Sequence, residues 1–192
     1  MAKNKNVETN EQEEEVNIVK ELLGMVVYVA FVILVVWFII TFVGQRTEVS
    51  GSSMYDTLED GDNLWINKLA YRFHDPERFD IVVFPYQDSS VYYIKRIIGL
   101  PGETVRFEED GTIYINDEPL EENYGYETIS PSMIGRAGED IVLGEDEYFV
   151  MGDNRNDSKD SRFEEVGNIH RDELEGKATF RIWPLSKFGK VE

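Results

Sequence analysis

The hydrophobic pattern divides the chain into a polar start, one long apolar segment and a remainder with short apolar runs. Between residues 22 and 43, only Gly24 and Thr41 interrupt the apolar side chains, and none of the side chains is charged. An α-helix of this length spans about 33 Å, which matches a bilayer hydrocarbon core of about 30 Å. The pattern therefore predicts a transmembrane helix over residues 22–43.

A cleaved signal peptide is the alternative interpretation of this segment. Such a peptide has an apolar region of only about 7–15 residues, followed by a small-x-small cleavage site. Residues 41–45, Thr-Phe-Val-Gly-Gln, offer no such site. The membrane anchor is the better interpretation.

The polar segment 1–21 includes the run Glu13-Glu14-Glu15, and we interpret most of it as a mobile tail. Three lysines lie in this tail, whereas Arg46 is the one basic residue close behind the apolar segment. The excess of positive charge before the helix favours a cytoplasmic polar tail. Residues 46–192 are then predicted to be extracytoplasmic.

The rest of the chain is predicted to form mostly β-strands. Short runs rich in β-branched and aromatic residues recur between turn signals. These runs are 63–68, 81–84, 91–98, 104–107, 112–116, 148–151 and 178–183.

A hairpin is predicted within this part. Residues 112–116 alternate with period two, and the turn signal Glu109-Asp110-Gly111 precedes them, so they pair with residues 104–107. Residues 121–140 show no sustained period and are interpreted as a loop. The segment 102–147 is thus a predicted hairpin and loop insertion. The fold class is mainly β, with an antiparallel sheet in one domain, 46–192, behind the transmembrane helix.

Composition narrows the functional classes. The net charge of −19 argues against a nucleic-acid partner, because the phosphates would be repelled. The absence of cysteine from the sequence excludes disulfides, a thiol nucleophile and cysteine metal sites. With 192 residues, 42% of them hydrophobic, the chain has room for one ordinary domain and an appendage.

A candidate nucleophile follows the predicted membrane helix. Ser53 lies in the segment 47–58, and a serine hydroxyl needs a neighbouring base to take its proton. The best candidate base is Lys95, in the apolar stretch 92–98. A strand that is apolar on both faces is buried on both, and burial lowers the pKa of a lysine toward the range of a general base. The alternatives are a linker serine and an exposed lysine on an edge strand.

A polar stretch, residues 151–162, follows the predicted strand 148–151. An EF-hand calcium loop is rejected, because Arg155 stands at the third position and Ser158 where glycine is needed. The closely placed Asp160 and Arg162 predict an ion pair that holds Ser158 against a buried lysine.

Four motifs occur in order behind the predicted membrane span. They are Ser53-Met54-x-x-Thr57-Leu58, then Tyr93-Ile94-Lys95-Arg96-Ile97-Ile98-Gly99-Leu100-Pro101-Gly102, then Gly152-Asp153-Asn154-Arg155 with Ser158, Asp160, Ser161 and Arg162, and finally Gly176-Lys177-Ala178 with Trp183-Pro184. This combination resembles type I signal peptidase, and it covers most of residues 47–184. The short chain, the single span and the small insertion resemble the Gram-positive bacterial branch.

The resemblance implies a serine endopeptidase in which Ser53 attacks and Lys95 accepts its proton, with no cofactor and no metal. Ser158 matches the position that hydrogen-bonds the lysine, while Asp160 and Arg162 match positions that brace the site. The main-chain N–H of Ser53 matches a donor to the developing oxyanion.

The resemblance also implies a substrate and a location. The pockets for small residues at the first and third places before the cut match Val49, Met54, Leu58, Tyr93 and Ile94. The expected partners are the lipid bilayer and secretory preproteins, whose signal peptides end in an A-x-A pattern. The implied enzyme is a monomeric, single-pass protein of the cell membrane.

Three features depart from the family pattern. Gly51 stands where some members carry a serine that assists the oxyanion, so a side-chain donor is missing. Asp56 replaces a usual proline, and Asn156-Asp157 reverses a common Asp-Asn order. None of these changes touches the proposed nucleophile or base.

Two other functions compete with this interpretation. One is a serine hydrolase that uses His74 or His170 with an aspartate, although both histidines lie in polar, charge-rich segments typical of a surface. The other is a membrane-anchored binding module without catalysis. Such a module is expected to have lost Ser53 or Lys95, and both are present.

Overall fold

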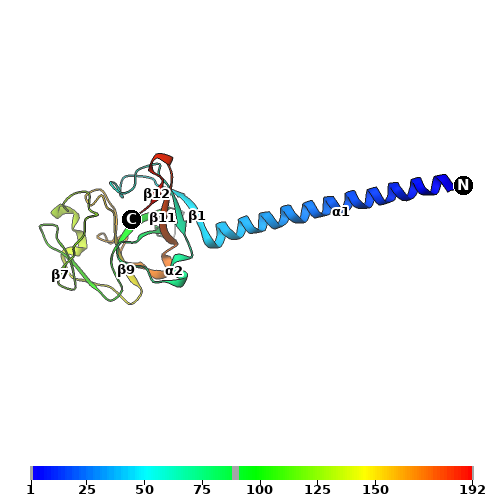
Figure 1. The fold of residues 1–192 in the computed structure, drawn as a ribbon. Coiled ribbons are helices and arrows are strands. Elements are labelled where there is room, and N and C mark those ends of the chain that lie inside the picture. The colour runs from blue at the N-terminus through cyan, green and yellow to red at the C-terminus, as the bar shows by residue number, and fades with distance from the viewer. Residues whose placement is uncertain (1, 88–90, 192) are drawn as a thin grey trace. The chain divides into compact units, whose positions relative to one another are not determined.

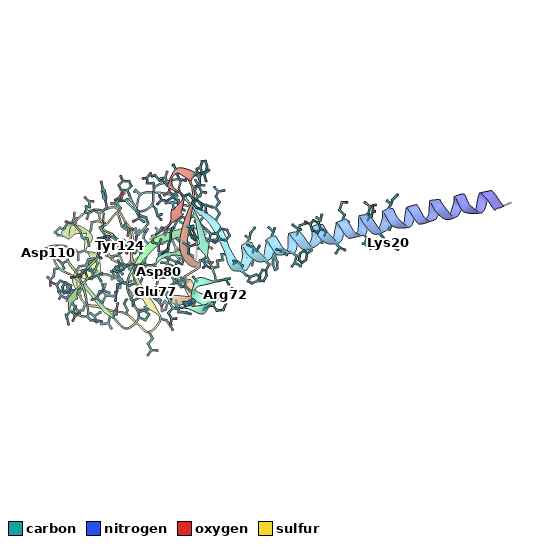
Figure 2. All side chains as sticks on the ribbon, viewed as in Figure 1. Lys20, Arg72, Glu77, Asp80, Asp110 and Tyr124 are labelled. Carbon is teal, nitrogen blue, oxygen red and sulfur yellow. The ribbon has the colours of Figure 1, made fainter. Side chains whose placement is uncertain are left out.

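The computed structural model describes residues 2–87 and 91–191, which form two compact units, Met1–Phe42 and Val43–Glu192. The long helix α1 (Ala2–Phe38) is followed by a π-helical turn, η1 (Ile39–Val43) (Figure 1). The second half of α1 and η1 together form the stretch Ile18–Val43, which is 26 residues long and apolar enough to cross a membrane. Figure 2 shows the side chains standing out along this helix from Lys20 onward, and the large apolar ones are exposed.

The start of the chain differs from the sequence-based expectation of a mobile tail. The structure has residues from Ala2 onward in α1. Residues 2–21 contain neither glycine nor proline and include many glutamates and lysines, which are good helix formers. The polar segment therefore continues the apolar helix toward the N-terminus without a break.

The second unit is a β-domain with two antiparallel sheets, one large and one small. The large sheet has the order β1-β2-β11-β3-β4-β9-β10, and β12 also pairs with β11. The small sheet has the order β7-β6-β5-β8. The strands of the large sheet are β1 (Gly44–Glu48), β2 (Asn63–Asn67), β3 (Ile81–Pro85), β4 (Tyr92–Gly99), β9 (Glu147–Met151), β10 (Ile169–His170), β11 (Gly176–Trp183) and β12 (Gly189–Lys190).

The sequence predicted the longer strands and missed the short or polar ones. All seven predicted runs are strands, with ends within two residues of the expected positions. The strands that were missed are β1, β7 (Glu118–Pro119), β8 (Ile141–Val142), β10 and β12. Four of these have only two residues, and β1, Gly-Gln-Arg-Thr-Glu, lacks the apolar β-branched residues that mark a strand.

The segment 102–147 forms the small sheet. Its strands β5 (Thr104–Phe107) and β6 (Ile113–Ile115) make the predicted hairpin, and Gly111 takes a φ of 87° in the turn between them. The expected loop is mostly irregular and includes the short 3₁₀ turns Pro131–Met133 and Gly135–Gly138. Buried side chains of this sheet, such as Val105 and Phe107, share one core with Phe149 of β9.

Strand β4 is buried on both faces, as its sequence predicted. Ile94 packs in a cluster with Val83 of β3, and Ile97 packs in a different cluster with Val150 of β9. β3 and β9 flank β4 through antiparallel pairing, so its backbone is hydrogen-bonded on both sides. The strand therefore holds Lys95 at a fixed place inside the domain.

Candidate active site

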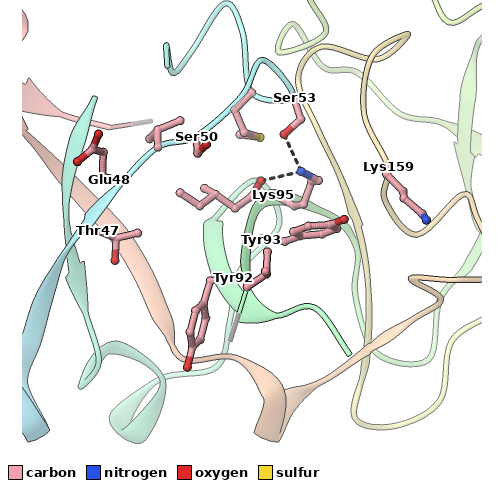
Figure 3. A pocket seen from close by; sticks show the side chains of 12 residues that line it. Thr47, Glu48, Ser50, Ser53, Tyr92, Tyr93, Lys95 and Lys159 are labelled. Carbon is pink, nitrogen blue, oxygen red and sulfur yellow. Dashed lines mark hydrogen bonds between the residues drawn. The ribbon is translucent and has the colours of Figure 1, made fainter. Parts of the chain in front are cut away.

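An open cleft of about 450 Å³ lies between residues 47–54 and the first half of β4 (Figure 3). Ser53 and Lys95 both line it, and Lys159 lines it from a third segment. The cleft thus joins three parts of the chain that the sequence analysis identified separately.

The turn that carries Ser53 is tied back to the end of β1. The backbone N–H of Val49 donates to the carbonyl of Asp62 at 2.8 Å, and that of Gly61 donates to the carbonyl of Val49 at 3.0 Å. Gly51 adopts a φ of 94°, which a residue with a side chain rarely takes, and its N–H donates to the Asp60 carboxylate. These bonds close residues 49–62 into a loop with Ser53 at the cleft.

Lys95 points its amine at the Ser53 hydroxyl. The distance from Lys95 Nζ to Ser53 Oγ is 2.7 Å, and Nζ also donates to the carbonyl of Ile94 at 3.1 Å. Figure 3 shows both contacts. The side chain is only 3% exposed. This is the spacing needed for a proton to pass between a nucleophile and its base.

Burial sets the protonation of this amine. Desolvation lowers the pKa of Lys95 from 10.5 to about 8, and it outweighs the opposing attraction of Asp160 and Asp153. The Arg162 cation lowers this pKa further. With this pKa, about a tenth of the amine is uncharged at pH 7 and can accept a proton.

Asp160 and Arg162 form the ion pair that their spacing predicted. Both side chains are fully buried, and Arg162 Nε and Nη2 lie 2.8 Å from the two oxygens of Asp160. Asp160 also accepts the N–H of Gly152 at 3.0 Å, while Arg162 donates to the carbonyl of Met133 at 2.9 Å. The pair fixes the polar loop, residues 152–162, against the end of β9.

Ser158 lies beside this pair but makes no hydrogen bond to Lys95. Its hydroxyl is buried and has no partner among the described residues. The residue lies against Gly152, where an added β-carbon would come within 2.3 Å of both Ser158 Oγ and the carbonyl of Ser53. The contact that the family resemblance implies for Ser158 is thus not formed in this structure.

A second buried ion pair was missed by the sequence analysis. Arg96 donates to both oxygens of Asp153, at 2.9 and 2.7 Å, and both side chains are fully buried. Asp153 also accepts the hydroxyl of Thr57 at 2.6 Å, and Tyr124 lies 3.8 Å from the Arg96 guanidinium. A signal was available, because an arginine inside a strand buried on both faces needs a buried carboxylate.

The polar loop also forms hydrogen bonds with the turn that carries Ser53, and the sequence analysis did not predict these contacts. Asn154 donates from its backbone to the carbonyl of Ser53 and from its side chain to the carbonyl of Ser52, both at 3.1 Å. The Ser52 hydroxyl donates to Asp157 at 2.6 Å. The carbonyls on both sides of the Ser53 N–H are therefore held in place.

Four of the five predicted pocket residues line the cleft. They are Val49, Met54, Tyr93 and Ile94. The fifth, Leu58, is fully buried and packs in the same apolar cluster as Val49, Met54 and Ile94, so it supports the wall from behind. The walls are accordingly apolar next to the reactive pair.

Neither histidine is placed to activate Ser53. His74 is exposed and lines a different hollow, and His170 lies 3.6 Å from Glu147 at the surface. In the described part of the chain, no group of three or more His, Asp or Glu side chains is positioned to hold a metal ion. The arrangement at the cleft is that of a serine hydrolase without a histidine base.

Comparison with known proteins agrees with this class. The family model described as signal peptidase, peptidase S26, matches residues 22–183. A probable signal peptidase I-2 of Synechocystis is 41% identical over 78% of this chain and 67% of that protein, and signal peptidase I T of Bacillus subtilis is 38% identical over 75% and 76%. Signal peptidase IB of Staphylococcus aureus is 31% identical over 88% of this chain and 93% of its own.

A solved structure is also similar. The crystal structure of a signal peptidase I from Enterococcus faecalis has 35% identity and a TM-score of 0.45, covering 55% of this chain and 98% of the other. Together with the family match, the sequence relatives identify the chain. It belongs to the signal peptidase family, peptidase S26, and is a serine endopeptidase.

The close contact at Gly152 leads to the first prediction. We expect Gly152→Ala to lower kcat/KM by at least about a hundredfold, because the new methyl group forces Ser53 or Ser158 aside and a shift of about 1 Å has a cost of this order. The matched control is Gly189→Ala, where an added β-carbon meets nothing within 4 Å. Equal activity in the two variants would refute the claim that Gly152 sets the position of Ser53.

The buried pair of Arg96 and Asp153 leads to the second prediction. Asp153→Ala removes the carboxylate that pairs with the buried Arg96 guanidinium, and we expect a loss of about 3–5 kcal/mol in the free energy of unfolding. Asp75→Ala removes a carboxylate that pairs with Arg171 but is 88% exposed, so it is expected to change stability little. Urea unfolding of the detergent-solubilised proteins measures both effects, and similar midpoints for the two variants would contradict the prediction.

Proposed function

We propose that the chain is a membrane-anchored type I signal peptidase that removes the signal peptides of secretory preproteins with a Ser53–Lys95 dyad. The observation that carries this proposal is the 2.7 Å contact between Lys95 Nζ and Ser53 Oγ. Lys95 is buried, and its amine has a lowered pKa. The family relationship supplies the substrate class, and the dyad supplies the chemistry.

In the proposed mechanism, Lys95 accepts the Ser53 proton as the hydroxyl oxygen attacks the scissile carbonyl carbon. The main-chain N–H of Ser53 donates to the resulting oxyanion. The protonated lysine then gives its proton to the leaving amine, which is the new N-terminus of the mature protein. Water, deprotonated by the same lysine, hydrolyses the acyl-enzyme and releases the signal peptide.

Three residues are assigned supporting roles. Asp160 and Arg162 hold the loop that contacts the Ser53 turn, through their bidentate buried pair. The buried hydroxyl of Ser158 has no partner among the described residues, so it can hydrogen-bond Lys95 when the amine changes its protonation. Such a bond orients the lysine lone pair toward Ser53.

The cleft walls are assigned to recognition of a small-x-small site. Val49, Met54, Tyr93 and Ile94 line the cleft, and Leu58 packs behind it. Tyr93 pairs with Phe84 of β3 in the sheet. The Tyr93 ring also stacks on the Tyr86 ring, with 4.6 Å between the ring centres, so neighbouring residues hold this wall in place. A braced wall next to the nucleophile restricts the side chains that fit beside the scissile bond.

The anchoring part of the proposal rests on the helix. Residues 22–43 span the lipid bilayer, residues 1–21 are cytoplasmic, and the domain 46–192 works as a monomer on the other side of the cell membrane. The helix has suitable length and exposed apolar side chains. Lysines before it and a single nearby arginine after it support this orientation. The segment 102–147 is proposed to be an insertion in that domain.

The third prediction tests the base. A lysine with a pKa of about 8 loses its proton as pH rises past this value. We therefore expect kcat/KM to be low below pH 8 and to increase as pH rises through 8. Lys95→Arg keeps the positive charge but cannot lose its proton, and we expect it to be inactive at every pH from 6 to 10. The control is His74→Ala combined with His170→Ala, which should retain activity. An active arginine variant would exclude Lys95 as the base.

The fourth prediction tests the substrate class. We expect the detergent-solubilised enzyme to cut a secretory preprotein after a small-x-small triplet, and mass spectrometry of the new N-terminus identifies the bond. Leucine in place of alanine just before the cut should reduce cleavage by about a hundredfold or more, because the branched side chain displaces the scissile carbonyl. The same replacement at the second position before the cut is the matched control. Equal cleavage of the alanine and leucine substrates would contradict the pocket assignment.

A further inference from the structure

Three charged side chains line the catalytic cleft among the described residues: Glu48, Lys95 and Lys159. In Figure 3, Lys159 lies on the opposite side of the Ser53–Lys95 pair from Glu48. Lys159 also lines an adjoining hollow of about 350 Å³, together with Met133 and Phe163. It therefore stands where the cleft continues beyond the reactive pair, and the two ends of the cleft carry opposite charges.

The backbone of Lys159 is firmly held. Its neighbours Ser158 and Asp160 are buried, and Asp160 is locked by its pair with Arg162. The Lys159 amine lies 5.6 Å from the centre of the Tyr86 ring, which stacks on Tyr93. The cation is thus anchored beside the cleft wall.

Lys159 is charged and available to a substrate. Hydrogen bonding to Tyr86 is the main reason why its pKa is raised above the ordinary lysine value, so the side chain remains protonated at neutral pH. The side chain is 47% exposed, and its ion pair with Glu165 has a distance of 4.0 Å with both partners open to solvent. Exposed pairs of this kind are weak, so a substrate carboxylate can compete with Glu165.

The surroundings make this cation selective. The chain carries a net charge of −19, and Asp157 and Glu165 line the same hollow as Lys159. Without Lys159, an acidic substrate residue at this end of the cleft would meet the like charges of Asp157 and Glu165. With it, a carboxylate gains an opposite charge, and a basic residue meets repulsion.

We infer that Lys159 is a specificity-determining residue that favours an acidic side chain in the first two positions after the cut. The assignment to these positions rests on the proposed pockets, because Thr47–Ser50, which include the pocket residue Val49, and Lys159 line opposite sides of the reactive pair. A chain whose small residues contact Val49 therefore leaves past Lys159. This inference rests on the proposed signal-peptide hydrolysis. It adds a preference for the start of the mature protein, which the small-residue pockets do not supply.

The test compares two peptides that differ only by glutamate or glutamine at the second position after a small-x-small site. For the full-length enzyme in neutral detergent, we expect kcat/KM to be about two- to fivefold higher for glutamate, the size of an exposed ion-pair effect. In Lys159→Met, the ratio of kcat/KM for the glutamate peptide to kcat/KM for the glutamine peptide should fall to one or below. The preference of the unmodified enzyme should also weaken as salt rises to about 0.5 M, because ions screen exposed charges.

Two controls separate the outcomes. Lys68→Met removes another partly exposed lysine, which pairs with Glu175 and is not among the described cleft-lining residues, and it should keep the glutamate preference. A second peptide pair carries the same exchange at the fifth position before the cut and should show no effect of Lys159→Met. A glutamate preference that survives Lys159→Met, or that occurs only before the cut, overturns the inference. Failure of the unmodified enzyme to cut any peptide refutes the proposed function itself.

Discussion

The geometry of the site depends on the buried ion pair between Arg96 and Asp153. Arg96 belongs to the strand that carries the lysine, whereas Asp153 belongs to the loop that follows β9, and the pair joins them with two hydrogen bonds. Asp153 also accepts Thr57, four residues after the nucleophile. One desolvated pair therefore positions three separate chain segments. The pair serves mainly to position these segments, because a buried ion pair adds little stability compared with well-packed apolar residues. Removing one partner of such a pair nevertheless destabilises a protein strongly.

Burial lowers the pKa of Lys95, and a neighbouring arginine reduces the opposing effect of the carboxylates. Two carboxylates, Asp153 and Asp160, lie near the lysine and favour its charged form. Each of them is already paired with its own arginine, Arg96 or Arg162, inside the protein. The Arg162 cation opposes this attraction, and the loss of hydration, which is the largest effect, outweighs what remains of it. A general base of suitable pKa results from the balance between burial and charge pairing.

The sequence predicted those features that depend on local pattern. Periodicity located β4, and its two apolar faces predicted that Lys95 is buried; the short spacing of Asp160 and Arg162 predicted their pair. Contacts between distant segments left no local signal. Examples are the hydrogen bond from Thr57 to Asp153 and the polar strand β1, which is defined by backbone pairing with β2. The helical start of the chain was missed because its polar composition also fits a mobile tail.

The departure from the family pattern at Asn156-Asp157 acquires a physical role in this structure. Asn156 donates to the carbonyl of Thr128 and accepts the N–H of Ser130, so it ties the polar loop to the segment before the first 3₁₀ turn. The next residue, Asp157, accepts the Ser52 hydroxyl. In this order, the amide meets backbone groups that both donate and accept, whereas the carboxylate, which only accepts, meets a hydroxyl. The loop thus links the Ser53 turn to a distant segment with each polar atom suited to its partner.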